Sequence, residues 1–278
     1  MTTVLDILDK GTAYLEKRGI EDARRNMQML VAHQLGCTRM ELYVRFDEPI
    51  DDSHLEPLRL ALKKRGEGTP VQHLLGSIFF RNHEFKTDAR GLIPRPETEE
   101  LAEWLAKNVT LSDGARILDM GCGSGVLGLS LAADFPEAEV TLADISTDAL
   151  DLARENAEFT GLKAHFLESD LFTALPADQT FDLIVANLPY VPEAEEVARE
   201  VRHDPALALF SGPDGMDLIR RFVPEAAQRL APGGWLAMEI GIDQSSETEV
   251  LLRAASLTDV LTVKDLSGIP RFPIARKP

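Results

Sequence analysis

The sequence predicts an α/β fold, in which a mostly parallel sheet carries helices on both faces and follows a small helical bundle. Two observations lead to this prediction. After residue 94, apolar strand-like runs alternate with amphipathic helical patterns, as in repeated βα units. Before residue 76, apolar residues instead recur at three- and four-residue steps, and glycines separate the segments that carry them.

Composition narrows the class of protein. The chain has 278 residues, which suits about two domains, and a net charge of −17. Residues 1–75 hold 12 acidic and 11 basic residues, whereas residues 76–278 hold 34 and 18. An acidic surface is a poor match for the negatively charged backbone of a nucleic acid. No apolar run approaches the ~18 residues of a membrane span. With only two cysteines, a disulfide framework is excluded. From these features we expect a cytoplasmic protein that binds no membrane and no nucleic acid directly. We also expect a monomer without a bound metal.

Three segments follow along the chain. Residues 1–75 are predicted to be the helical unit, in which the basic cluster Lys63-Lys64-Arg65 is expected to be a solvated helix face. Residues 76–93 are short, aromatic and partly alternating, which predicts a β-hairpin connector. Residues 94–278 contain the sheet. Its strands are predicted at 115–120, 139–144, 164–169, 181–186 and 234–240, and its helices from near Glu97, at 126–134, at 147–160 and over 218–230.

The first candidate site is the turn DMGCGSG, residues 119–125, between an apolar strand and an apolar helix. Val126 stands where a dinucleotide-binding turn needs its third glycine, and Asp119 would lie unfavourably near a pyrophosphate. Asp144 ends the next strand, 23 residues after Gly121, where a carboxylate can accept hydrogen bonds from both ribose hydroxyls. S-adenosylmethionine, with a ribose, an ammonium group and no phosphate, suits this pattern. A dinucleotide site and a purely structural turn are the alternatives.

The second candidate site is the tetrapeptide Asn187-Leu188-Pro189-Tyr190, at the end of the strand predicted for 181–186. The side-chain oxygen of Asn187 and the backbone carbonyl of Leu188 can accept both hydrogens of a planar –NH2 group. Pro189 restricts the backbone, and the ring of Tyr190 can stack on a flat substrate. Taken alone, the tetrapeptide could simply be the extended turn that follows a strand. It is, however, expected at the same edge of the sheet as the glycine turn.

Several sequence blocks together resemble the peptide chain release factor glutamine methyltransferases (the PrmC/HemK family) over nearly the whole chain. The blocks are PVQHLLGSIFF (70–80), LIPRPETEEL (92–101), LDMGCGSG (118–125), ADIS (143–146), SDLF (169–172), NLPY (187–190), LAPGGWLAMEIG (230–241) and DLSGIPR (265–271). The resemblance implies a Rossmann-like class I S-adenosylmethionine-dependent methyltransferase sheet of seven strands and an N-terminal substrate-recognition domain. It also implies methylation of the glutamine side-chain nitrogen in the Gly-Gly-Gln motif of release factors, which modulates translation termination, with S-adenosylhomocysteine as product.

The resemblance also implies a role for individual residues. Those of the cofactor site are Gly121, Cys122, Gly123, Ser124 and Gly125 around the methionine and ribose, Asp144 at the ribose, Asp170 and Leu171 at the adenine, and Asn187. Those of the catalytic site are Asn187, Leu188, Pro189 and Tyr190, and residues 95–98 are expected near the methionine end.

Two positions depart from the family pattern. Leu188 replaces a proline that is usual in the family, which adds an N–H and removes rigidity, and Leu171 stands where an aromatic residue is common. Cys122 is interpreted as a small apolar filler rather than a nucleophile. Two other functions remain open: an adenine amino-methyltransferase acting on nucleic acid, which would need a basic channel, and a catalytically silent module that only binds S-adenosylmethionine.

Overall fold

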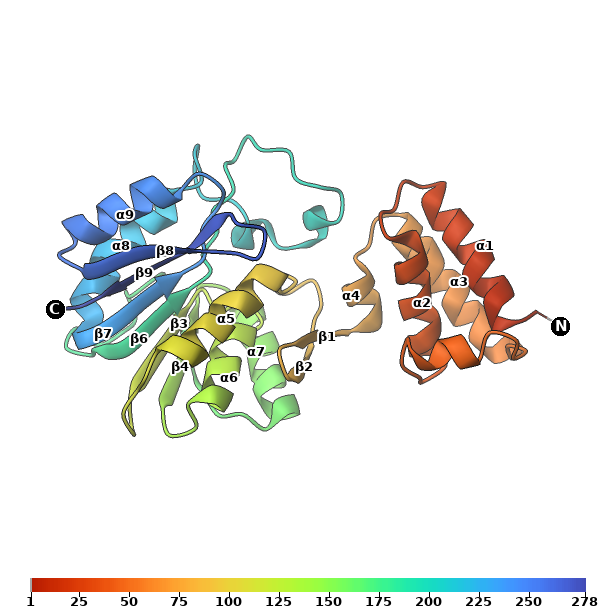
Figure 1. Cartoon of the computed structure of the whole chain (residues 1–278), viewed down its shortest axis with the longest axis horizontal. Coiled ribbons are helices and arrows are strands. Elements are labelled where there is room, and N and C mark those ends of the chain that lie inside the picture. Colours follow the sequence, from red (N-terminus) through yellow and green to blue (C-terminus); the bar gives the residue numbers. More distant parts are fainter. Residues whose placement is uncertain (1) are drawn as a thin grey trace. The chain divides into compact units, whose positions relative to one another are not determined.

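The protein, seen in a computed structural model that describes residues 2–278, divides into two compact units (Figure 1). Unit 1 takes in the chain up to Ser77 together with Val197–His203, and unit 2 comprises Ile78–Glu196 and Asp204–Pro278. Across residues 2–278, no helix is long and apolar enough to cross a membrane.

Unit 1 is a helical bundle around an apolar core that includes Leu8, Leu15 and Val31, as the spacing of apolar residues predicts. A capping box formed by Thr3 and Asp6 begins the first helix, and the side chain of Asp51 accepts a hydrogen bond that caps the third. Its helices are α1 (Val4–Glu16), α2 (Ala23–Gln34), η1 (Glu41–Val44), α3 (Asp52–Gly66), α4 (Val71–Leu75) and η2 (Val201–His203).

Arg65 is buried in unit 1, so the prediction that its whole basic cluster is solvated is wrong at this position. Its guanidinium donates to Asn26 Oδ1 at 2.7 Å and to the Thr69 carbonyl at 3.2 Å, and it forms an ion pair with Glu200. These partners replace the water that the charge loses on burial. They also attach Val197–His203, which is remote in sequence, to the bundle.

Unit 2 is built on a seven-stranded sheet of order β5-β4-β3-β6-β7-β9-β8, parallel except for β9, which runs antiparallel to both its neighbours. This confirms the predicted α/β class and the mostly parallel sheet. The strands are β3 (Arg116–Met120), β4 (Glu139–Asp144), β5 (His165–Glu168), β6 (Phe181–Ala186), β7 (Leu230–Met238), β8 (Thr258–Lys264) and β9 (Pro270–Arg276). The helices are α5 (Pro96–Asn108), α6 (Val126–Asp134), α7 (Thr147–Thr160), η3 (Ala206–Ala208), α8 (Asp217–Arg229) and α9 (Ser245–Ala254).

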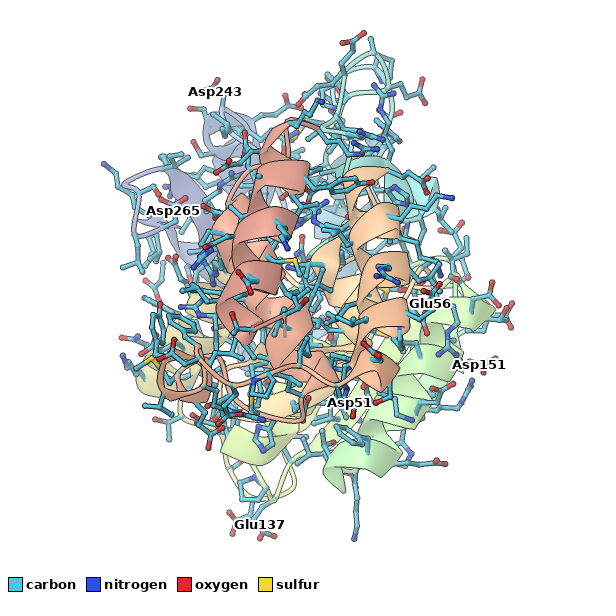
Figure 2. The ribbon with its side chains drawn as sticks, turned by 90° about the vertical axis from the view of Figure 1, so that its right-hand side faces the viewer. Asp51, Glu56, Glu137, Asp151, Asp243 and Asp265 are labelled. Atoms are coloured by element: carbon cyan, nitrogen blue, oxygen red, sulfur yellow. The ribbon has the colours of Figure 1, made fainter. Side chains whose placement is uncertain are left out.

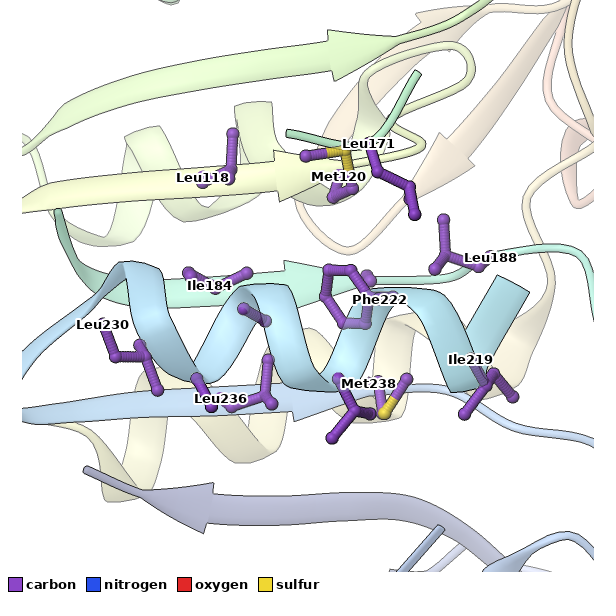
Figure 3. Close-up of a cluster of buried hydrophobic side chains, with 14 of the residues drawn as sticks. Leu118, Met120, Leu171, Ile184, Leu188, Ile219, Phe222, Leu230, Leu236 and Met238 are labelled. Carbon is purple, nitrogen blue, oxygen red and sulfur yellow. The ribbon is translucent and has the colours of Figure 1, made fainter. Parts of the chain in front are cut away.

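Both faces of the sheet are buried, which explains why its strands read as continuous apolar runs. Along β6, Leu183 packs into the core cluster shared with α5, α6 and α7, whereas its neighbour Ile184 packs into the cluster shared with α8. Figure 3 shows this second cluster, in which Phe222 of α8 lies over the sheet. The strand predicted at 234–240 begins earlier, because Leu230 already pairs with Phe181 of β6.

The hairpin connector consists of β1 (Ser77–Phe80) and β2 (His83–Lys86), which form a separate two-stranded sheet. Asn156 of α7 binds its end: the side chain accepts from Lys86 N–H at 2.7 Å and donates to the Lys86 carbonyl at 3.1 Å. The same amide nitrogen donates to the carbonyl of Ser124 at 2.9 Å. This buried amide therefore joins the hairpin to the glycine turn.

Candidate active site

A cavity of about 300 Å³ opens at the carboxyl ends of β3, β4 and β6, a volume that suits a small-molecule ligand. The register places these ends together, because Met120 pairs with Ala143 on one side and with Ala186 on the other. The predicted site residues that line the cavity are Gly121, Cys122, Gly123, Ser124, Asp144, Asp170, Leu171, Asn187, Leu188 and Pro189. Gly125 and Tyr190 are not part of the lining.

The glycine turn depends on backbone conformations that favour glycine. Gly121, Gly123 and Gly125 have φ values of 69°, 54° and 79°. A Cβ atom on Gly121 would also approach Leu188 Cδ2 to 2.8 Å. The N–H of Gly121 donates to the Ala143 carbonyl at 2.8 Å, and Gly125 caps the start of α6. The turn therefore presents its backbone to the cavity. Gly125 lies outside the cavity lining and contributes to the turn by capping the start of α6.

Asp144 is the half-buried carboxylate at the end of β4. Its Oδ2 accepts from Gly123 N–H at 2.8 Å, and its Oδ1 accepts from Ser146 N–H at 2.9 Å. Burial raises the pKa of this carboxyl, and these backbone hydrogen bonds oppose the rise. Each oxygen keeps a further lone pair, so the group can accept hydrogen bonds from two adjacent hydroxyls in the cavity.

Asp119 lies deeper and is 1% exposed. Its Oδ2 accepts from Gly128 N–H at 2.8 Å. Burial raises the pKa of the carboxyl to about 7, which the Gly128 hydrogen bond opposes and the nearby charge of Asp144 increases. A Cβ on Gly128 would lie 2.2 Å from Leu142 Cδ2 and 2.9 Å from Asp119 Oδ2. The absence of a side chain at Gly128 therefore lets the start of α6 lie this close to Asp119. The sequence pattern did not single out Gly128.

This carboxyl predicts a measurable dependence of stability on pH. Because the pKa of Asp119 is raised from 3.8 to about 7 in the folded protein, the folded state binds the proton more tightly than the unfolded state. Its contribution is fully present below pH 4 and is lost as pH rises through about 7. The free energy of unfolding of the ligand-free protein, relative to Asp119→Asn, should therefore fall between pH 4 and 7. Urea unfolding at several pH values measures this difference, and parallel profiles would contradict it.

Cys122 lies in the glycine turn as a buried thiol. Burial, together with the carboxylates of Asp119 and Asp144, raises its pKa. The thiol is thus protonated at neutral pH, and a protonated thiol is a poor nucleophile. This environment favours the interpretation of Cys122 as an apolar filler.

The third group of lining residues follows β5. Asp170 forms a bidentate ion pair with Arg221 of α8, both oxygens lying 3.0 Å from the same guanidinium nitrogen. Leu171 has a positive φ of 48°, and its side chain packs into the core, as Figure 3 shows. Leu171 therefore borders the cavity from the core side. Arg221 also lines the cavity and was not predicted from the sequence.

The tetrapeptide after β6 is fixed by its side chains. Asn187 Nδ2 donates to Thr98 Oγ1 at 3.0 Å and to Glu239 Oε2 at 3.1 Å. The Tyr190 hydroxyl donates to Glu239 Oε1 at 3.1 Å, and the Tyr190 carbonyl accepts from Gln244 Nε2 at 3.0 Å. Burial and the neighbouring Glu239 raise the pKa of Tyr190, which keeps its phenol protonated. These bonds hold the segment although residue 188 is not proline.

Leu188 contributes its side chain to the core, where it is 4% exposed (Figure 3). The packing of Leu188 against Gly121 couples the tetrapeptide to the glycine turn. Proline could not supply the same branched side chain. The extra flexibility expected of leucine is therefore countered by burial.

The block at 92–101 meets the same edge of the sheet. Arg95 precedes α5 and pairs with the buried Asp204 at 2.7 Å, and Thr98 of the first turn donates to Glu239 Oε2 at 2.7 Å. Arg95 and Thr98 line the cavity, whereas Pro96 and Glu97 are not part of the lining. Glu239 was missed as a site residue. Its only signal in the sequence is a single acid in the apolar run LAMEIG.

Similarity to known proteins extends over both units of the chain. The family model "PrmC N-terminal domain" matches residues 6–76, and the "Methyltransferase small domain" matches residues 96–214. A release factor glutamine methyltransferase of Deinococcus radiodurans is 38% identical over 98% of both chains. One of Geobacter sulfurreducens is 38% identical over 97% of this chain and 95% of its own.

A solved structure shares a large part of the fold. The T. thermophilus 16S rRNA N2 G1207 methyltransferase, solved with S-adenosylmethionine and guanosine, is 25% identical and superposes with a TM-score of 0.53. The match covers 73% of this chain and 50% of that one. The seven-stranded sheet is thus that of the class I methyltransferases.

Proposed function

Because the chain belongs to the family of release factor glutamine methyltransferases, we propose that it methylates the glutamine side-chain nitrogen in the Gly-Gly-Gln motif of peptide chain release factors, with S-adenosylmethionine as donor. One observation carries the proposal. The amide nitrogen of Asn187 is bound by Thr98 and Glu239, so its oxygen is the atom that remains for a ligand in the cavity. An amide oxygen recognises the hydrogens of a planar –NH2 group.

The residues around the cavity fit S-adenosylmethionine. The glycine turn leaves room for a ligand to approach the backbone, and Asp144 can accept from the ribose hydroxyls. Asp119 lines the cavity, and its ionised form would suit an ammonium group. Asp170 and Leu171 border the place proposed for the adenine. When bound, the sulfonium supplies an electrophilic methyl group.

The tetrapeptide would orient the substrate. Asn187 Oδ1 and the backbone carbonyl of Leu188 would accept the two hydrogens of the glutamine amide, which is a weak nucleophile because its lone pair is delocalised. Two acceptors also favour the positive charge that develops on the nitrogen during attack. The step then depends on alignment rather than on a basic side chain. Tyr190, bound to Glu239 through its hydroxyl, would serve as a wall of the substrate site rather than of the cofactor site.

Unit 1 is proposed to recognise the release factor, which its match to the PrmC N-terminal domain supports. The surface of unit 2 would suit a basic partner, and Figure 2 shows the exposed acids Glu137, Asp151 and Asp243 pointing outward. The proposed reaction would take place in the cytoplasm, where translation termination occurs.

A labelling experiment tests the function. The protein is incubated with methyl-labelled S-adenosylmethionine and, separately, with a release factor, with the same factor carrying alanine in place of the motif glutamine, and with nucleic acid. We expect label only in the unmodified release factor. Label in nucleic acid would instead support an adenine amino-methyltransferase. Cofactor binding without any transfer would support a silent binding module.

A further inference from the structure

Glu239 lies at the carboxyl end of β7 and is 2% exposed. Its N–H donates to the carbonyl of Ala186 at 2.9 Å, which places it beside the start of the tetrapeptide. Its two oxygens accept from three side chains: Thr98 at 2.7 Å, Asn187 at 3.1 Å and Tyr190 at 3.1 Å. Glu239 does not itself line the cavity, so it acts on the site through these partners.

The hydrogen-bond inventory of this cluster determines which way the Asn187 amide faces. A carboxylate can only accept, and the single hydroxyl hydrogen of Thr98 is donated to Glu239. The Thr98 oxygen must therefore accept as well. Both neighbours of the Asn187 terminus are acceptors, so the –NH2 group must face them. The reversed amide would place Oδ1 about 3.1 Å from a carboxylate oxygen, which is repulsive.

We propose that Glu239, together with Thr98, is a positioning residue for methyl transfer, which fixes the Asn187 amide with its oxygen toward the substrate nitrogen. This inference rests on the proposed function and names the residues that give its site the correct polarity. The same carboxylate holds the Tyr190 phenol, so one charge orients both ends of the tetrapeptide. The role needs a negative charge, because a neutral group of the same shape can donate as well as accept.

The surroundings of Glu239 make this charge sensitive to pH. Burial raises the pKa of the Glu239 carboxyl, and the hydrogen bonds from Thr98 and Tyr190 lower it. Among the nearby charges, Glu97 on α5 raises this pKa and Arg271 on β9 lowers it. A protonated Glu239 can donate to Asn187 Oδ1 and permit the reversed amide. The maximal rate kcat should therefore fall as pH decreases through the raised pKa of Glu239.

The main test is Glu239→Gln, which keeps the shape and removes the charge. We expect kcat for release factor methylation to fall about 100-fold, as for a misaligned reacting group, while the Kd of S-adenosylmethionine changes less than about threefold. The decrease of kcat at low pH should also disappear. The exposed Glu137→Gln is the matched control and should keep both the rate and the pH profile. An unchanged kcat with the acidic decrease intact would overturn the proposal.

A second pair of variants covers the case in which Glu239→Gln folds poorly. Thr98→Val removes the hydroxyl and Thr98→Ser keeps it, so kcat should be about tenfold higher in the serine variant. Equal rates in the two variants would contradict the role given to the hydroxyl.

A readout without substrate separates this inference from the proposed function. In the protein alone, the side-chain –NH2 of Asn187, assigned by its loss in Asn187→Ala, should exchange its hydrogens with water slowly. Exchange should be about tenfold faster in Glu239→Gln, because the charge-assisted hydrogen bond from Asn187 is replaced by a weaker bond to a neutral group. Slow exchange that depends on Glu239, in a protein that methylates no release factor, would reject the function and keep the orientation. Exchange equally fast in both would reject the orientation.

Discussion

Replacing Asn187 with alanine should lower kcat for release factor methylation by about 1,000-fold or more, the magnitude typical of losing a group that stabilises developing charge. The variant removes the proposed acceptor for the substrate amide. It leaves the glycine turn and Asp144 in place, because neither is hydrogen-bonded to the Asn187 side chain. The Kd of S-adenosylmethionine should therefore change less than about threefold.

Steady-state kinetics and calorimetry on the same preparations measure the two effects. Asn187→Asp provides a sharper version of the experiment, because it keeps the shape but places a second carboxylate about 3.1 Å from Glu239. It should be as inactive as the alanine variant. Asn108→Ala, on the exposed end of α5, is the control. Equal losses of kcat and of cofactor affinity would assign Asn187 to the cofactor rather than to the substrate.

The second large effect is expected for Asp144→Ala, which should weaken the binding of S-adenosylmethionine about 100-fold. Hydrogen bonds to a charged acceptor contribute about 1.5–3 kcal/mol each, and Asp144 is proposed to accept from the ribose. The variant also frees Gly123 N–H, which Asp144 now holds at 2.8 Å. Loss of the side chain thus removes a ligand contact and loosens the glycine turn.

Calorimetric titration measures this Kd directly. Asp151→Ala is the matched control, because this acid is exposed on α7 and pairs only with Arg154 among the described side chains. At saturating S-adenosylmethionine, Asp144→Ala should recover most of its kcat, whereas Asn187→Ala should not. An unchanged Kd in Asp144→Ala would refute the role proposed for this residue.

The alternating part of unit 2 could be predicted from the sequence almost residue by residue. β4, β6, α6 and α7 have the predicted bounds, because buried strands and amphipathic helices carry strong periodic signals. β8 and β9 carried no such signal and were anticipated only as part of a seven-stranded family fold. Most residues of β8 are exposed or half-buried, since it is an edge strand, so its sequence lacks a clear apolar pattern.

The two candidate sites could be located from the sequence because the rules of parallel sheets bring strand ends together. The sequence could not show how the tetrapeptide is held. Asn187 and Glu239 are 52 residues apart, and Thr98 lies 89 residues before Asn187. Bonds over such separations depend on the strand order, which places β7 beside β6.

By itself, the sequence determined the fold class, the position of the glycine turn and the choice of Asp144 and Asn187, since strand periodicity and strand-end chemistry are local properties. Only the tertiary structure decided which atom of Asn187 faces the cavity, that Arg65 is buried, and that Leu188 packs on Gly121. The physical reason is that burial and hydrogen-bond partners belong to the assembled fold. The sequence around Arg65 is typical of a surface charge, and Leu188 is expected to be a more flexible replacement for proline. Each side chain acquires its role from neighbours that are remote in the sequence.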